Sequence, residues 1–507
     1  MPRFPIPLVG GSSKSVSTSL DSQRCINLYP EILDSGLGKA KIALVNTPGL
    51  TLCGSSTTIT GPQRPGGMIT IQRGSLNPAI YGIAGTDFFT YTGSSLITST
   101  IASLGSLITS GGPVSMVDNG TVMLVVDGSY YYKWISTFAQ YTDAALTTGA
   151  EFCAYLDGFI IINDKGTYKF RVSPLNWNGT DAWSSLAFGE ANQNPEPING
   201  IKVVGRDVFV FKKNGFEVWY NAGLATFPLA RNQSVSSQIG LYAKSSLTIM
   251  NDSLFWLGGG KEGYGKVYMM QGYNPVKVSN SALENEIVSY ARSDDAIGMA
   301  YHEGAHSFYV LTFPSEGKTH VYDSLTGYWH ERLYRNPVTC LFECWKPYAM
   351  TTLGIKVFIG DDVFENHMLA GDSNFSDLTY RLYLVDPESY TDNGDTIVRI
   401  RTSPHIFDSQ TLNRMFFRRL QTDIETGVGL TTGQGSDPTL MMRYSDDGGK
   451  TWSNNRYTSF GKIGEYSKRA IFNRLGSGRD RVWELSVSDP VPVRISGAYV
   501  DAEVGTM

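Results

Sequence analysis

The feature that most constrains the fold is a short β unit that recurs about seven times between residues 69 and 375. Each unit has an apolar strand, a Gly or Asn turn, a second apolar strand, another Gly turn and an aromatic strand. Copies begin roughly every 35–47 residues, which is the spacing of four-stranded propeller blades. The copies are 79–89, 114–134, 154–171, 201–220, 241–278, 297–329 and 338–369.

This repeat predicts an all-β protein with a β-propeller, and it favours seven blades while six are also compatible. A blade cannot bury both of its faces alone, and stacking the blades in a ring covers them and leaves only short edges. The 54 Gly, 28 Tyr and 24 Phe suit many short strands with tight turns. A large β-sandwich with coincidental spacing is the alternative. We expect strand edges and side chains to fill the centre of the propeller.

The chain of 507 residues is too long for a single core. We expect an N-terminal segment at 1–60, the propeller at 61–375 and a C-terminal β-sandwich at 376–507, where blade spacing ends. Long amphipathic helices are scarce. One short helix is predicted from Ala282 to Ala291, where Leu283, Ile287 and Val288 recur at helical spacing.

Charge and cysteine content exclude several classes of protein. The net charge is −5, and residues 399–507 hold 15 Lys and Arg against 12 Asp and Glu, a net of +3. Three prolines within residues 1–7 argue against a secretory signal, and an apolar run of about 18 residues is absent, so we expect no membrane insertion. Five scattered cysteines suit a reducing compartment. Modules that read DNA sequence are not apparent.

Two apparent catalytic motifs are better explained as hairpins. His302-Glu303-Gly304-Ala305-His306 has zincin spacing, but its flanks are strand-like, and a zincin needs both histidines on one helix face. The run 260–266 has the spacing of a phosphate loop, but Val267 stands where a Ser or Thr would hold magnesium. We therefore predict no catalytic residue, no metal and no cofactor.

Residues 445–452 are similar to the Asp-box motif of sialidases. The match consists of Ser445, Asp447, Gly449, Thr451 and Trp452. The motif is a hairpin turn in which the carboxylate accepts backbone N–H groups, Gly permits positive φ and the Trp packs beneath. Sialidases repeat the box from blade to blade, whereas this chain has one box outside the repeats. The resemblance implies a structural turn, and a glycosidase is the alternative, testable with a fluorogenic sialoside.

An arginine-rich strand follows the start of the predicted sandwich. Arg414, Arg418 and Arg419 flank Phe416 and Phe417, and they could contact phosphate or an acidic partner. The simpler interpretation is a strand whose alternate residues are buried and whose arginines are solvated. We keep these three arginines as a candidate interface.

Both ends of the chain resemble the packaged-DNA stabilisation proteins of short-tailed bacteriophages, the tail hub or nozzle family. The residues that carry the resemblance are 24–31, 47–50, 446–452, 464–466, 474–476, 479–482, 484, 486 and 488–491. They lie in the segment before the first repeat and in the predicted sandwich, so the resemblance spans most of the chain.

This resemblance implies a structural, non-enzymatic protein of the virion tail, assembled in the host cytoplasm. It implies a homo-oligomer, a hexameric ring, below the portal and its adaptor, which retains the packaged genome and forms part of the channel for DNA ejection. Other implied partners are tail needle, spike or fibre proteins, and double-stranded DNA would pass without sequence recognition. A glycan-binding receptor module, using aromatics such as Tyr130–Tyr132 and Trp134, is a further alternative that a glycan array would test.

Overall fold

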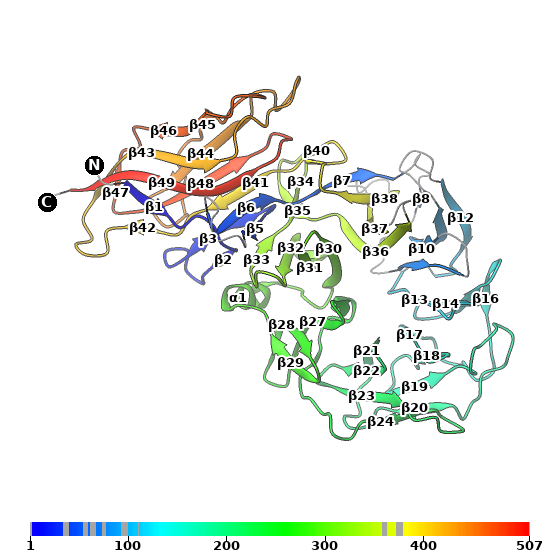
Figure 1. The fold of residues 1–507 in the computed structure, drawn as a ribbon. Helices are drawn as coiled ribbons and strands as arrows, with labels where there is room; N and C mark the ends of the chain where they lie inside the picture. Colours follow the sequence, from blue (N-terminus) through cyan, green and yellow to red (C-terminus); the bar gives the residue numbers. More distant parts are fainter. Residues whose placement is uncertain are drawn as a thin grey trace.

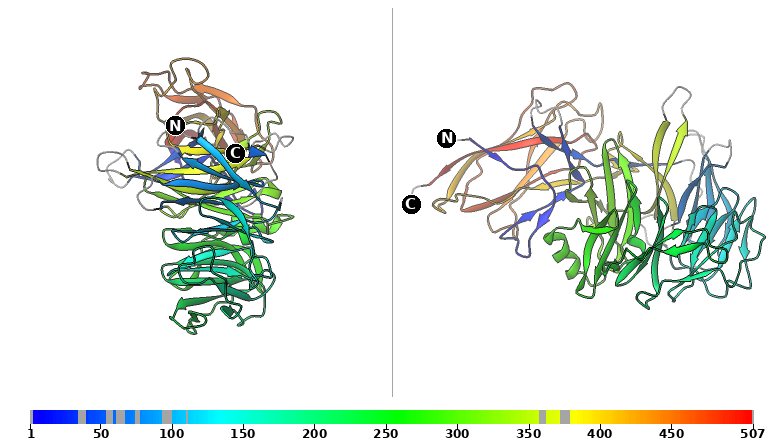
Figure 2. Two further views of the ribbon diagram at one scale, coloured as in Figure 1. Left: turned by 90° about the vertical axis from the view of Figure 1, so that its right-hand side faces the viewer. Right: turned by 60° about the horizontal axis from the view of Figure 1, so that its bottom comes forward.

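The molecule consists of a ring of β-sheets with a β-sandwich beside its rim (Figure 1). The computed structural model describes residues 3–33, 40–53, 59–60, 67–73, 78–92, 100–109, 111–356, 362–371 and 379–505. Two further views show that the sandwich lies next to the ring and not over its centre (Figure 2). The predicted propeller and sandwich are therefore confirmed.

Six sheets follow one another around the ring, and each is antiparallel with its first strands nearest the centre. The first three sheets contain β9 (Met68–Ile71), β10 (Ala79–Ala84), β11 (Asp87–Thr92) and β12 (Thr100–Ser106); β13 (Ser115–Asp118), β14 (Met123–Val126), β15 (Tyr131–Trp134) and β16 (Phe138–Tyr141); β17 (Cys153–Leu156), β18 (Phe159–Asn163), β19 (Lys169–Val172) and β20 (Phe188–Glu190). The next three contain β21 (Ile198–Val204), β22 (Asp207–Lys212), β23 (Gly215–Asn221) and β24 (Leu229–Arg231); β25 (Gly240–Leu241), β26 (Thr248–Met250), β27 (Ser253–Gly260), β28 (Gly263–Gln271) and β29 (Asn274–Lys277); β30 (Ile297–Glu303), β31 (His306–Phe313), β32 (Lys318–Asp323) and β33 (Trp329–Glu331).

A seventh sheet closes the ring with a strand from the beginning of the chain. Its strands β36 (Pro347–Lys356), β37 (Asp362–Gly371) and β38 (Thr379–Asp386) are followed by β7 (Gly49–Leu52), which pairs antiparallel with β38. A Cβ on Gly49 would lie 2.3 Å from the carbonyl oxygen of Thr391, so a larger residue would push the closing strand away. Seven sheets thus form the ring within the described residues, in agreement with the seven repeats. The short strands β8 (Ile59–Thr60), β39 (Thr391–Asp392) and β40 (Asp395–Thr396) extend this sheet.

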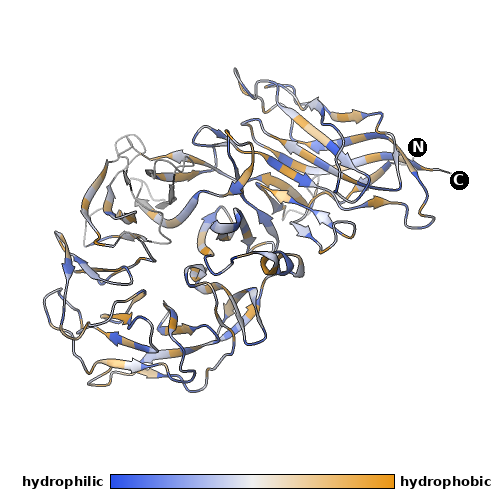
Figure 3. Cartoon of the chain, turned by 180° about the vertical axis from the view of Figure 1, so that it is seen from behind, coloured by the Kyte–Doolittle hydropathy of each residue, from blue (hydrophilic) through white to orange (hydrophobic). Residues whose placement is uncertain are grey.

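The sandwich packs two sheets that include strands from both ends of the chain. One sheet contains β5 (Leu28–Ile32), β6 (Ile42–Asn46), β49 (Arg494–Val504), β43 (Met415–Ile424) and β46 (Ala470–Asn473), with β1 (Arg3–Ile6) and β47 (Ser477–Gly478) at its edges. The other contains β4 (Cys25–Ile26), β41 (Arg399–Thr402), β48 (Asp480–Val487), β44 (Thr439–Ser445), β45 (Arg456–Ser459) and β42 (Ile406–Phe407). Alternate residues such as Phe417, Leu420, Trp483 and Leu485 form the core between them. Strands in both domains accordingly alternate between hydrophobic and hydrophilic residues (Figure 3).

The two domains share one continuous sheet. The last strand of the sixth blade, β33, pairs in parallel with β4, and β4 pairs antiparallel with β41 of the sandwich. The division at 1–60, 61–375 and 376–507 stays a prediction, and we propose to draw the second boundary after Asp386, because β38 pairs within the seventh sheet. We call the region where the propeller and the sandwich meet the joint, and it also contains two hairpins. One hairpin consists of β2 (Ser13–Lys14) and β3 (Ser22–Gln23), and the other of β34 (Leu333–Arg335) and β35 (Phe342–Cys344).

The predicted helix is present as α1 (Ser281–Ser289). The Asn280 side chain caps its start by accepting a hydrogen bond from the Leu283 N–H at 2.8 Å, and Leu283 and Ile287 are buried. Short 3₁₀ turns, η1 (Lys244–Ser246) and η2 (Pro314–Glu316), lie in the fifth and sixth sheets. None of the helices in the described ranges is long and apolar enough to cross a membrane.

The expectation of a filled centre is wrong. A cavity of about 320 Å³ lies between the innermost segments of all seven sheets. Its wall includes Gly67, Gly200 and Gly298, which have no side chains to extend toward the axis. The repeat pattern identified the strands but carried no information about how far apart their inner edges would lie.

Candidate functional site

The joint between the propeller and the sandwich is organised around Asn27, which follows β4 and is 1 % exposed. Its side-chain amide donates to the carbonyls of Leu333 at 2.9 Å and Val398 at 2.8 Å, and its side-chain oxygen accepts from the Leu333 N–H at 3.0 Å. Asn27 has a φ of 54°, a conformation that Asn tolerates better than most residues. One residue from the N-terminal segment thus satisfies backbone groups next to the sixth blade and next to the sandwich.

An ion pair between Arg24 and Glu331 lies beside this residue. The Arg24 guanidinium donates to both Glu331 carboxylate oxygens, at 3.1 and 2.7 Å. Burial alone raises the pKa of Glu331, but the attraction and hydrogen bonds of Arg24 outweigh it and lower this pKa to about 2. Glu331 therefore stays ionised at neutral pH as long as Arg24 is present.

Buried arginines hold the N-terminal segment against both domains. Arg401 on β41 donates to the carbonyls of Leu8 at 2.5 Å and Gly11 at 2.8 Å, and to the Gln23 side chain at 2.7 Å. Arg332, which follows β33, donates to the Pro48 carbonyl at 2.6 Å and lies 3.6 Å from the centre of the Trp345 ring. These contacts satisfy carbonyls that strand pairing leaves open.

The Asp-box turn joins β44 to the loop before β45, and Asp447 is its centre. The Asp447 carboxylate accepts from the hydroxyls of Ser445 and Thr451, both at 2.6 Å, and from the N–H groups of Lys450 and Thr451 at 2.9–3.0 Å. These hydrogen bonds hold the pKa of Asp447 well below its usual range. Gly449 has a φ of 87°, and its N–H donates to the Ser445 hydroxyl at 2.8 Å.

Trp452, the aromatic residue of the motif, is half-buried and packs against Arg443. The Arg443 guanidinium lies 4.7 Å from the centre of the Trp452 ring. All five motif residues, Ser445, Asp447, Gly449, Thr451 and Trp452, thus lie in or next to one turn. Their role as a structural turn stays our prediction.

We predict that Asp447→Ala loosens this turn without changing the fold. The backbone N–H groups of Lys450 and Thr451 should exchange with deuterium about tenfold faster, because each loses its acceptor. Asp437→Ala, in another exposed loop of the sandwich, is the matched control. Unchanged exchange at Lys450 and Thr451 would contradict this role for Asp447.

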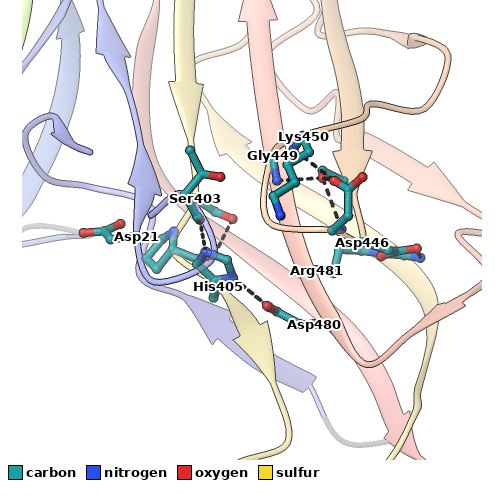
Figure 4. A network of polar contacts seen from close by, with 12 residues as sticks. Asp21, Ser403, His405, Asp446, Gly449, Lys450, Asp480 and Arg481 are labelled. Carbon is teal, nitrogen blue, oxygen red and sulfur yellow. Dashed lines mark hydrogen bonds and ion pairs between the residues drawn. The ribbon is translucent and has the colours of Figure 1, made fainter. Parts of the chain in front are cut away.

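The Asp-box turn lies next to the β2–β3 hairpin of the N-terminal segment (Figure 4). A Cβ on Gly448 would lie 2.9 Å from the Ser19 Cα, so the two loops approach closely at this glycine. On the same side, His405 contacts the Asp480 carboxylate at 2.8 Å and the Thr18 carbonyl at 2.9 Å. Asp446 accepts two hydrogen bonds, at 2.6 and 2.7 Å, from Arg481, which is 1 % exposed.

Arg418 and Arg419 lie on β43 and Arg414 directly precedes it, but the three candidate interface arginines do not form a single group. Arg414 and Arg418 are exposed, whereas Arg419 is partly buried and pairs with Asp501 at 2.7 Å. The neighbouring Phe416 is 51 % exposed, while Phe417 is in the sandwich core. The outer face of β43, together with Arg414 just before it, therefore presents Arg414, Phe416 and Arg418 to solvent.

The two rejected motifs are hairpins. Gly304, with a φ of 57°, turns β30 into β31, and residues 260–266 span the hairpin in which Lys261 and Glu262 turn β27 into β28. His306 is buried between Asp323 at 2.8 Å and Glu31 at 2.6 Å, and His302 instead contacts the Ser307 hydroxyl. Across the described residues, no group of three or more His, Cys, Asp or Glu side chains is placed to hold a metal ion.

Comparison with known proteins gives two family matches. The model of the bacteriophage P22 Gp10 β-propeller matches residues 4–331, and the model of the bacteriophage P22 Gp10 β-sandwich matches residues 399–503. No curated protein matches the chain.

Solved structures to which the chain shows some similarity include a chain from an S. cerevisiae complex of Dbp5 with Nup159 and Gle1. It has a TM-score of 0.39 and 9% identity, covering 67% of this chain and 96% of that chain. BamB from Moraxella catarrhalis has a TM-score of 0.33 and 12% identity, covering 66% of this chain and 97% of that chain.

Proposed function

The chain belongs to the bacteriophage P22 Gp10 family of packaged-DNA stabilisation proteins, and we propose that it is the tail hub that closes the DNA-filled head below the portal and adaptor. As a member of this family it is a structural phage protein. The observation that carries the proposal is that the two matched ranges take in most of the propeller and most of the sandwich. In this role the protein retains the packaged genome, forms part of the ejection channel and needs no catalysis.

We propose that several copies, a hexamer by the family resemblance, form the ring through which DNA leaves. The axial cavity of one propeller, at about 320 Å³, has the volume of only about ten water molecules and is too small for a DNA duplex. DNA would therefore run along the axis between copies. A hexamer of this chain would carry a charge of about −30, and an acidic lining would let DNA pass without sticking.

The joint supports this role because it makes the propeller and sandwich one body. A continuous sheet, the Asn27 amide and several buried arginines connect the two domains. A subunit of this kind presents two docking surfaces at a fixed separation, which suits contact with an adaptor on one surface and a needle, spike or fibre protein on another.

The test is to deplete this chain during infection and measure the DNA content of the released heads. Heads should package DNA and then lose it, and adding back the purified protein should restore retention. Depletion of a tail fibre protein is the control, because its loss should leave filled heads. Stable, filled, tailed particles without this chain would contradict the closure role and favour the sugar-binding and glycosidase alternatives.

We also propose that the outer face of β43 binds an acidic surface of a virion partner. Arg418→Glu should reduce assembly of the hub onto adaptor-bearing heads at least about tenfold, since it reverses a charge on an exposed face. Lys261→Glu, an equal charge reversal at the exposed turn between β27 and β28, is the control. Co-sedimentation with heads measures the assembly of each variant. Equal assembly of the two variants would contradict the proposal that this face is an interface.

A further inference from the structure

The axial cavity of the propeller is lined by polar backbone as well as by side chains. The innermost strands, among them β9, β13, β17, β21, β30 and β36, each pair with a neighbouring strand of the same sheet on one side only. Their other edges face the axis, so backbone N–H and C=O groups that strand pairing does not use line the cavity. Side chains bond some of them, since the N–H groups of Glu151 and Phe152 donate to the Asn163 side chain at 2.9 Å. Such a wall can hydrogen-bond a polar occupant from several directions.

A lysine side chain in this cavity has no counter-ion. Lys202, on β21 of the fourth sheet, lines the cavity, and within the described part of the chain it has neither a carboxylate partner nor a hydrogen bond. Burial lowers the pKa of its amine, although the residue is partly exposed. Both observations fit an amine that is partly shielded from bulk water at the wall of the cavity.

The titratable group that acts on this amine is a neutral thiol. Cys153, the first residue of β17, is buried, and burial raises the pKa of its thiol to about 12. Its sulfur is 3.3 Å from the Ser115 hydroxyl. At neutral pH the thiol therefore supplies no negative charge to balance Lys202.

The other charged side chains of the cavity wall neutralise each other. The Lys244 amine from η1 contacts the Glu151 carboxylate, which lies just before β17, at 2.7 Å. This pair connects the fifth sheet to the third, and Lys202 belongs to the fourth sheet between them. The wall as described thus has one positive charge in excess, and it lies at Lys202.

We propose that this cavity binds a small oxyanion such as inorganic phosphate. The anion would contact the Lys202 amine and inward-facing backbone N–H groups. An amine that is partly shielded from bulk water without a partner is costly, and a bound anion supplies both the missing charge and the missing hydrogen bonds. The volume of about 320 Å³ admits phosphate with accompanying water. This inference is independent of the proposed role in the phage tail.

The experiment is a calorimetric titration of the full chain with sodium phosphate, and separately with sodium acetate, at constant ionic strength. The chain should bind about one phosphate, and Lys202→Met should weaken that binding at least about tenfold. Lys261→Met, which removes an exposed amine outside the cavity, should bind like the unchanged chain. Saturable binding of acetate that is also lost in Lys202→Met would identify the anion as a carboxylate and support the same site.

Thermal unfolding separates a lost site from a misfolded variant. Without phosphate, Lys202→Met should unfold at the same temperature as the unchanged chain or higher, since it removes an unpaired amine that is partly shielded from water. With phosphate, the unfolding temperature of the unchanged chain and of Lys261→Met should rise, and that of Lys202→Met should not. Equal phosphate affinity in Lys202→Met, or no saturable binding of either anion by the unchanged chain, would overturn the proposal.

Discussion

Asn27→Ala should lower the free energy of unfolding by roughly 3–4 kcal/mol, because it leaves three buried backbone groups without partners. These groups are the N–H and carbonyl of Leu333 and the carbonyl of Val398. Alanine is also strained at the φ of 54° that Asn27 adopts. Urea unfolding followed by tryptophan fluorescence would measure the change.

Asn27→Gly separates the two contributions to this loss. Glycine adopts positive φ freely, so this variant should be about 1 kcal/mol more stable than Asn27→Ala while still lacking the amide. Asn119→Ala, which removes a side-chain amide from the turn between β13 and β14 of the second blade, serves as the control. If Asn27→Ala cost no more than this control, Asn27 would not be the residue that connects the domains.

Arg24→Met should cost about 2–4 kcal/mol at pH 7, since it leaves the Glu331 carboxylate buried without its cation. This is below the loss expected for a fully buried pair, because the Arg24 side chain is 33% exposed. The double variant Arg24→Met with Glu331→Gln should recover part of the loss, because the unpaired charge is then removed as well. Urea unfolding of the four proteins of this cycle gives the coupling energy.

The cost of Arg24→Met should depend on pH in a defined direction. Arg24 lowers the folded-state pKa of Glu331 from 4.5 to about 2, so the stability that ionised Glu331 contributes is present above about pH 5 and lost as the pH falls toward 2. The difference in stability between the unchanged chain and Arg24→Met should therefore shrink over this range. A difference that stays constant from pH 6 to pH 3 would contradict the assignment of this pKa to the Arg24 pair.

Local sequence patterns were sufficient to identify the blades, the helix α1 and the sandwich. Their strands are joined mainly by short hairpins, and the alternation and turn residues that form a hairpin lie within about 20 residues of each other. The Asp-box residues were found for the same reason, because Ser445 and Thr451 bond to Asp447 within a single turn.

Local sequence patterns could not predict the contacts that join the propeller to the sandwich. Leu50 on β7 pairs with Val385, and Asn27 contacts Leu333, so each partner lies about 300 residues away in the chain, where periodicity carries no information. Buried arginines such as Arg401 were missed because charged residues are nearly always exposed, and their burial depends on carbonyls brought together only by the fold. A resemblance at residues 24–31 marked this segment but did not give its contacts.

Because strands from the two ends of the chain pair with each other, the first strands must be synthesised long before their partners. Val45 on β6 pairs with Arg494 on β49, and Leu50 on β7 pairs with Val385 on β38. At translation rates of about 5–20 residues per second, roughly 20–90 seconds pass between the synthesis of β6 and that of its partner β49. During that interval the first strands are open edges available to other nascent chains, so the yield of folded protein in the infected cell should depend on how well host chaperones cover them.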